Sequence, residues 1–175
     1  IRDMELRGAP LIGMAAAYGI CLALRGMPET SHDEFMKRIR ELAEFLAKAR
    51  PTAVNLVWVL DRLIKKVDRL EGESVAFKIE VLAPGAVEIQ REDARICRAI
   101  GENFVSLMRN GMTLLTHCNA GSLATAQYGT ATSPMYIAKE RGWDLTVYAD
   151  ETRPYLQGSR LTTFELQQAG IRVVL

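Results

Sequence analysis

The six residues from Thr116 to Gly121 combine an imidazole, a thiol and a carboxamide with a turn made of small residues. We expect this run to end a buried strand and to open a helix, and ligands of open α/β sheets bind beyond the carboxyl ends of the strands. Free backbone N–H groups and the positive end of the helix dipole would then favour a bound phosphate and the thiolate form of Cys118. Such a thiol is usable as a catalytic acid or base. The alternative, a buried cysteine that only fills space, stays open at this point.

A second polar loop, residues 150–158, follows the next predicted strand and ends in Gln157 and Gly158. It carries two carboxylates, an arginine and an amide, and loops at this edge of a sheet carry function more often than other segments. The alternative is a solvated loop in which Arg153 pairs with Asp150 or Glu151.

Two further arginines stand at helix boundaries. Arg7 precedes Gly8, Ala9 and Pro10, where a helix is expected to start, and Arg50 lies where a helix breaks. A guanidinium group binds phosphate oxygens with two N–H donors, so both arginines are candidate phosphate ligands. Taken alone, each is more simply explained as a surface residue.

The elements that would position these residues follow from hydrophobic periodicity. The pattern predicts helices over residues 11–24, from Ser31 to Arg50, and over residues 53–70. Ser31 with Glu34 has the form of a capping box. A further helical pattern runs from residue 73 to about residue 110, and we expect Pro84 to interrupt or kink it.

After Gly111 the spacing of the apolar residues changes from a helical pattern to that of short strands. We expect strands at residues 112–117, 145–149 and 171–175, the first buried on both faces, with helices at residues 122–141 and 159–169. The fold class is therefore α/β: an N-terminal helical region (residues 1–110) is followed by the first half, strand-helix-strand-helix-strand, of a Rossmann-like parallel sheet (residues 111–175). A sheet ending at its third strand would leave an apolar edge unpaired, and both ends of the chain look truncated.

Composition narrows the function classes. The 175 residues are 49% apolar and 25% charged, with a net charge of +1. No basic cluster favours nucleic acid, no apolar run reaches the length of a membrane span, and no signal peptide is recognisable. The three cysteines show no CxxC spacing, which favours reduced thiols in the cytoplasm over disulfides or a zinc site. Cys21 and Cys97 fall in apolar helical settings and are expected in the core.

Four motifs add a resemblance to a known family. They are residues 7–13 (RGAPLIG), 50–56 (RPTAVNL), 116–121 (THCNAG) and 148–158 (YADETRPYLQG). In this order they resemble the methylthioribose-1-phosphate isomerases, which share a superfamily with the regulatory subunits of eukaryotic translation initiation factor 2B. The resemblance covers essentially the whole chain.

The resemblance implies an aldose–ketose isomerase that converts 5-methylthioribose 1-phosphate to 5-methylthioribulose 1-phosphate in methionine salvage, without a metal or other cofactor. It implies that Cys118 is the catalytic cysteine. The positions matching the family's substrate-binding motifs are Arg7, Gly8, Ala9, Arg50 and Gln157. The implied partners are a small sugar phosphate and a second copy of the chain in a cytoplasmic homodimer, with no nucleic acid or membrane.

The departures from the family pattern concern both ends of the chain. The family's catalytic aspartate and an Asn-Lys pair lie in motifs beyond Leu175, and the opening segment is missing, so we expect an incomplete piece that is inactive alone. Two alternatives remain. One is a ribose 1,5-bisphosphate isomerase, which also uses a cysteine. The other is a non-catalytic regulatory subunit related to translation initiation factor 2B, although such subunits generally lack the Cys118 motif.

Overall fold

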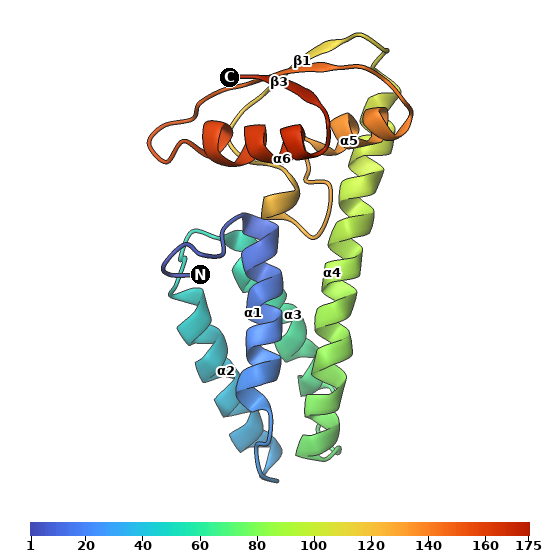
Figure 1. Ribbon diagram of the computed structural model, residues 1–175. Coiled ribbons are helices and arrows are strands. Elements are labelled where there is room, and N and C mark those ends of the chain that lie inside the picture. The colour runs from blue at the N-terminus through green and yellow to red at the C-terminus, as the bar shows by residue number, and fades with distance from the viewer. The chain divides into compact units, whose positions relative to one another are not determined.

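The computed structural model describes all residues from 1 to 175, which form two compact units, residues 1–91 and residues 92–175. The first unit is helical, and the second contains a small parallel sheet with helices (Figure 1). The long helix α4, Val75–Val105, contributes to both units. The predicted fold class, helices followed by a strand-helix-strand-helix-strand pattern with a parallel sheet, is confirmed.

In the first unit, α1 (Ala9–Leu24) packs against α3 (Val54–Asp68). Pro10 stands in the first turn of α1, where its missing N–H leaves no bond unmade. Small residues let the two helices approach closely: a Cβ on Gly13 would lie 3.1 Å from the Asn55 carbonyl oxygen. The same contact brings the N-terminal ends of both helices to one end of the unit.

The helix α2, His32–Ala47, begins at a complete capping box. The Ser31 hydroxyl accepts a hydrogen bond from the Glu34 N–H at 3.2 Å, and the Glu34 carboxylate accepts one from the Ser31 N–H at 3.4 Å. Phe35 and Ile39 form its buried stripe. The predicted break between α2 and α3 is also confirmed, because residues 48–53 form turns.

The helix α4 is not interrupted at Pro84, one of the two effects expected there, and the expected kink stays a prediction. The helix continues through this residue without interruption. Proline removes one helical N–H, and burial of Leu82 and Ala86 on either side of it favours the continuous helix. The division between the two compact units falls inside α4, between residues 91 and 92. The domain boundary expected at residue 110 was placed where the helical pattern of the sequence ends, and it stays a prediction.

The second unit is built on three parallel strands in the order β1-β2-β3: Thr113–Thr116, Thr146–Ala149 and Arg172–Val174. Thr116 pairs with Ala149, so β1 and β2 end at the same level. The connections contain a short helix η1 (Ser122–Ala124) and α5 (Ser133–Glu140) after β1, and η2 (Gly158–Thr162) and α6 (Thr163–Gln168) after β2.

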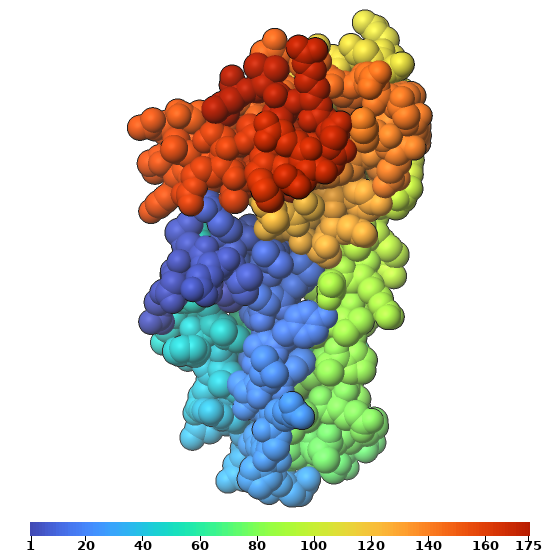
Figure 2. Space-filling view, in the orientation of Figure 1, coloured from blue at the N-terminus to red at the C-terminus, as the bar shows by residue number.

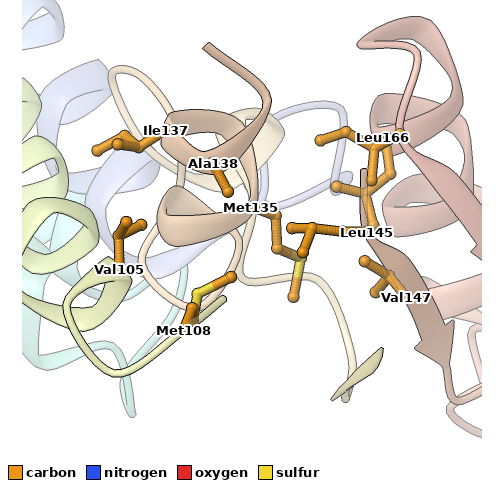
Figure 3. Packing of buried hydrophobic residues seen from close by; sticks show 9 residues of the cluster. Val105, Met108, Met135, Ile137, Ala138, Leu145, Val147 and Leu166 are labelled. Carbon is orange, nitrogen blue, oxygen red and sulfur yellow. The ribbon is translucent and has the colours of Figure 1, made fainter. Parts of the chain in front are cut away.

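One apolar core holds this unit together. Side chains from the end of α4, from α5, from β2 and from α6 converge in it (Figure 3). The labelled members are Val105, Met108, Met135, Ile137, Ala138, Leu145, Val147 and Leu166. The sheet, α5 and α6 are therefore fixed to one another, and the loops that follow β1 and β2 start from a rigid base.

Two expectations for this unit are wrong. The strand β1 is not buried on both faces: it lies at the edge of the sheet, and the Leu115 side chain is 70% exposed. The helix expected over residues 122–141 begins only at Ser133, because the preceding residues form η1 and an irregular loop. No helix in the chain is both long enough and apolar enough to cross a membrane.

Candidate functional site

The loops that follow β1 and β2 meet at the carboxyl end of the sheet, as parallel pairing requires. The Asp150 N–H donates to the Thr116 carbonyl at 3.1 Å, which extends the pairing one step past both strands. Immediately beyond it, His117 Nδ1 and Asp150 Oδ2 lie 3.0 Å apart. The expected meeting of the two polar loops at this edge is therefore present.

Cys118 is partly buried, and its backbone is held from both sides. Its N–H donates to Thr152 Oγ1 at 2.9 Å, and its carbonyl accepts from Thr162 Oγ1 at 2.5 Å. Its φ of 62° lies in the left-handed region, which L residues other than glycine rarely adopt. Two threonines from separate segments thus fix an unfavourable backbone conformation at the thiol.

The helix dipole expected to act on Cys118 is not there, because η1 has only three residues and α5 begins fifteen positions after the cysteine. The intervening loop is held by its own hydroxyl groups. Thr125 Oγ1 accepts from the Gly129 N–H at 3.0 Å, and Thr132 Oγ1 donates to the Tyr128 carbonyl at 2.7 Å. Local bonds of this kind compete with helix formation.

Glu165 on α6 is 5% exposed, and it was not among the residues predicted for the site. It accepts hydrogen bonds from Asn119 Nδ2 at 2.7 Å, Ser122 Oγ at 2.6 Å and the Leu123 N–H at 3.2 Å. All three donors belong to the loop that carries Cys118. A lone glutamate between apolar helix residues gives no sequence signal of burial, so only the tertiary structure reveals this role.

Gly121 packs directly on this carboxylate. A Cβ at Gly121 would lie 1.5 Å from Glu165 Oε1, so the loop reaches Glu165 only because residue 121 has no side chain. Its φ of −102° is ordinary, and the requirement is one of space. The small residues of the predicted turn therefore serve close packing rather than a helix start.

The second loop divides into an exposed part and a buried part. Arg153 pairs with Glu151 at 3.5 Å, and its side chain is 77% exposed, which matches the solvated ion pair that the sequence left open. Gly158 lies against the end of β2, since a Cβ there would be 1.6 Å from the Asp150 carbonyl oxygen. The adjacent Gln157 has a buried Oε1 atom that accepts no hydrogen bond.

The remaining predicted site residues belong to the first unit. Gly8, with φ of 95°, precedes α1, and Ala9 is the first residue of that helix. Arg7 directly precedes Gly8, and Arg50 lies in the turn before α3. Because the starts of α1 and α3 share one end of the unit, the structure brings Arg7 and Arg50 to the same end. Cys118 and Gln157 are likewise brought to one end of the second unit.

The other two cysteines lie on helices, Cys21 on α1 and Cys97 on α4. Burial, followed by the Asp93 carboxylate, raises the pKa of Cys97 to about 11, and burial raises the pKa of Cys21. All three cysteines are unpaired, as expected from their number and spacing. Cys97 is fully buried in the core, while Cys21 is only partly buried. Neither lies in a loop at the sheet edge.

Comparison with protein families matches residues 5–175 to the Initiation factor 2 subunit family. The chain belongs to this family. Its relatives include proteins named 5-deoxyribose 1-phosphate isomerase. The one from Clostridium botulinum (strain Okra) is 51% identical over 173 residues, which cover 99% of this chain and 50% of that protein. The one from Bacillus cereus is 51% identical over 175 residues, which cover 100% of this chain and 50% of that protein. The chain thus spans about half the length of these relatives.

The chain is also similar to two solved structures. It superposes on 5-methylthioribose 1-phosphate isomerase from Pyrococcus horikoshii with a TM-score of 0.89 at 35% identity, covering 98% of this chain and 48% of that one. It superposes on the delta subunit of translation initiation factor 2B from A. fulgidus with a TM-score of 0.86 at 42% identity. The match covers 100% of this chain and 51% of that one.

The comparisons refine the expected resemblance. The superfamily of translation initiation factor 2B is confirmed as the family of this chain. The narrower family, the methylthioribose-1-phosphate isomerases, is matched by a solved structure at 35% identity. The curated relatives at 51% identity are instead named for 5-deoxyribose 1-phosphate. Both names describe isomerases of sugar 1-phosphates.

Proposed function

We propose that this member of the Initiation factor 2 subunit family forms part of an aldose–ketose isomerase acting on a ribose 1-phosphate that lacks the 5-hydroxyl group. The observation that carries the proposal is the clamped, partly buried Cys118 at the carboxyl end of the sheet. The names of the relatives at 51% identity support this class of substrate.

The chemistry explains why an acid and a base must be held in place. A phosphate on the anomeric oxygen prevents the simple ring opening that other aldose–ketose isomerases use. In the reaction the bond between C1 and the ring oxygen breaks, and the ring oxygen takes up a proton. One hydrogen moves from C2 to C1, and the C2 hydroxyl loses its proton as it becomes the carbonyl, so reactant and product are isomers. Positioned proton-transfer groups accelerate such steps by about 10²–10⁴-fold.

The residues then take the following roles. Cys118 is one member of the acid–base pair, and the second member is not assigned to a residue of this chain. Gln157 contacts the sugar: its buried, unpartnered Oε1 would accept a hydrogen bond from a substrate hydroxyl. The guanidinium groups of Arg7 and Arg50 are the proposed phosphate ligands, and Gly8 and Ala9 belong to the same substrate-binding motif as Arg7.

The first candidate substrate is 5-deoxyribose 1-phosphate, because the relatives at 51% identity carry that name. The second is 5-methylthioribose 1-phosphate, as in methionine salvage, and the structural match at a TM-score of 0.89 favours it. The two differ only at C5, where a hydrogen replaces a methylthio group. We further propose that the enzyme acts as a cytoplasmic homodimer that needs no metal or other cofactor.

The test is a substrate comparison on the polypeptide encoded by the complete reading frame. Phosphorus NMR would follow the conversion of 5-deoxyribose 1-phosphate, 5-methylthioribose 1-phosphate and ribose 1,5-bisphosphate. We expect kcat/KM for one of the first two to exceed that for the bisphosphate by at least about tenfold. The isolated 175-residue chain is the comparator and is expected to be inactive.

Two results would contradict the proposal. Turnover of the bisphosphate alone would favour the related bisphosphate isomerases. No turnover of any of the three compounds would favour a non-catalytic subunit of the kind found in translation initiation factor 2B. Near-normal rates from the isolated chain would contradict the expectation that it is inactive alone.

A further inference from the structure

The buried carboxylate of Glu165 is bound entirely by neutral donors. The segment around α6 lies at the surface in Figure 2, yet Glu165 itself is 5% exposed, so its side chain points inward. Three of its hydrogen bonds come from an amide, a hydroxyl and a backbone N–H within residues 119–123, and the Tyr136 side chain on α5 also hydrogen-bonds with it. Tyr136 lies beside it, and the Glu165 carboxylate adds to the burial that raises the pKa of Tyr136 to about 12. A carboxylate in such surroundings is costly unless its lone pairs are satisfied, which fixes the loop tightly to α6.

A series of hydrogen bonds connects Glu165 to Cys118, and the donor and acceptor of each are fixed by the carboxylate. Because Glu165 Oε1 is an acceptor, Asn119 must present its NH₂ group, which also donates to Thr162 Oγ1 at 3.3 Å. Thr162 has a single hydroxyl proton, and with its oxygen already accepting from Asn119, that proton goes to the Cys118 carbonyl at 2.5 Å. Through the hydrogen bonds of Asn119 and Thr162, the Glu165 carboxylate therefore determines that the Thr162 hydroxyl donates to the Cys118 carbonyl.

We infer that Glu165 is a positioning residue for the thiol of Cys118, acting through Asn119 and Thr162; this inference rests on the proposed function of that thiol. The clamp holds Cys118 at φ of 62°, a conformation the backbone does not favour on its own. Glu165 touches no reacting atom. Its proposed effect is to hold the loop, and with it the Cys118 sulfur, in one orientation. Without these hydrogen bonds the loop would move away from that conformation.

The isosteric change Glu165→Gln tests the direction of the bonds rather than the packing. The new amide oxygen can still accept from Ser122 and Leu123, but its NH₂ group then faces the NH₂ group of Asn119. Asn119 must turn over, its oxygen then faces Thr162, and the Thr162 proton leaves the Cys118 carbonyl. In the full-length enzyme we expect kcat to fall about 10²-fold while KM stays within about threefold. Glu140→Gln is the matched control, because that carboxylate is exposed and binds Arg98 and Tyr128.

Adjacent threonines provide a second, independent pair of variants. Thr162→Val removes the donor to Cys118 and is expected to lower kcat as Glu165→Gln does, while Thr162→Ser keeps the hydroxyl and restores activity. Thr163→Val is the control, since Thr163 donates to the Ser159 carbonyl within the helical turn. Because both changes break one path, the double variant Glu165→Gln/Thr162→Val is expected to be no slower than either single variant.

Hydrogen exchange provides a readout that does not depend on the substrate. In Glu165→Gln the backbone amides of residues 118–123 are expected to exchange at least about tenfold faster, with those of α1 unchanged. Unchanged exchange in this segment would overturn the inference, whether or not the protein is an isomerase. Faster exchange with unchanged kcat in an active enzyme would also overturn it. If the wild-type protein turns over none of the substrates, the proposed function fails, and the exchange rates alone decide whether Glu165 clamps the loop.

Discussion

Changing Cys118 to serine in the full-length protein is expected to lower kcat for the sugar 1-phosphate by about 10²–10⁴-fold. A hydroxyl is a far weaker acid than a thiol, so proton transfer at residue 118 is lost while the shape of the site is retained. The hydrogen bonds of the residue to Thr152 and Thr162 are made by its backbone, so the substitution leaves them in place. The midpoint of thermal unfolding is therefore expected to change little, and initial rates with saturating substrate measure the effect.

The control for this variant is Cys21→Ser. Cys21 is a partly buried thiol on α1 in the other unit, and its replacement is expected to leave kcat unchanged. Cys97 is a poor control because it is fully buried. If the Cys118 variant keeps wild-type activity, Cys118 is not the catalytic acid or base. Retention of activity would then direct the search to another group at the same edge of the sheet.

Changing Gly121 to alanine is expected to be damaging for a different reason. The added methyl carbon would lie 1.5 Å from Glu165 Oε1 and 2.2 Å from its Cδ, so either the loop or the carboxylate must move. Overpacking of this kind lowers the free energy of unfolding by about 1–3 kcal/mol. Because the loop carries Cys118, we also expect kcat to fall about 10²-fold. Thermal unfolding and steady-state kinetics measure the two effects separately.

Two comparisons identify the cause of that loss. Gly72→Ala is the control, because a Cβ there meets nothing within 4 Å. The double variant Gly121→Ala/Glu165→Ala is the sharper test, since it removes the group that the new methyl would meet. Adding Gly121→Ala to the Glu165→Ala background is expected to cause little further loss of stability. An equal loss in both backgrounds would show that the contact with Glu165 is not responsible.

The sequence predicted the regular elements well where local signals and burial agree. The capping box at Ser31 and the apolar stripe that follows it identify α2, and small residues after Pro10 identify α1. The expectation of a helix failed over residues 122–132, where five of the eleven residues are serine, threonine or glycine. Their hydroxyls bond to nearby backbone groups and replace the helical pattern. The better signal was Pro134, which stands in the first turn of α5.

The meeting of the two polar loops could be predicted from the sequence, but the side chains that hold Cys118 could not, and the catalytic role of Cys118 stays a prediction. Parallel pairing of β1 with β2 brings the Cys118 and Asp150 loops together, as the order of the elements implies. The groups that hold Cys118 could not be predicted, because Thr152, Thr162 and Glu165 contact it or its loop only after the chain has folded. Each is between 34 and 46 positions from the loop residue that it binds. The backbone strain at residue 118 likewise follows from these contacts.

The left-handed backbone at Cys118 has an evolutionary consequence. A residue with a side chain pays about 1–2 kcal/mol to adopt this conformation, and glycine does not. On backbone conformation alone, glycine is therefore favoured over cysteine at residue 118. If the thiol is catalytic, as proposed, its chemistry is what we expect to keep cysteine at this position. In a family whose members are named both as isomerases and as translation-factor subunits, we therefore expect cysteine at this position in the isomerases and glycine to be tolerated there in the subunits.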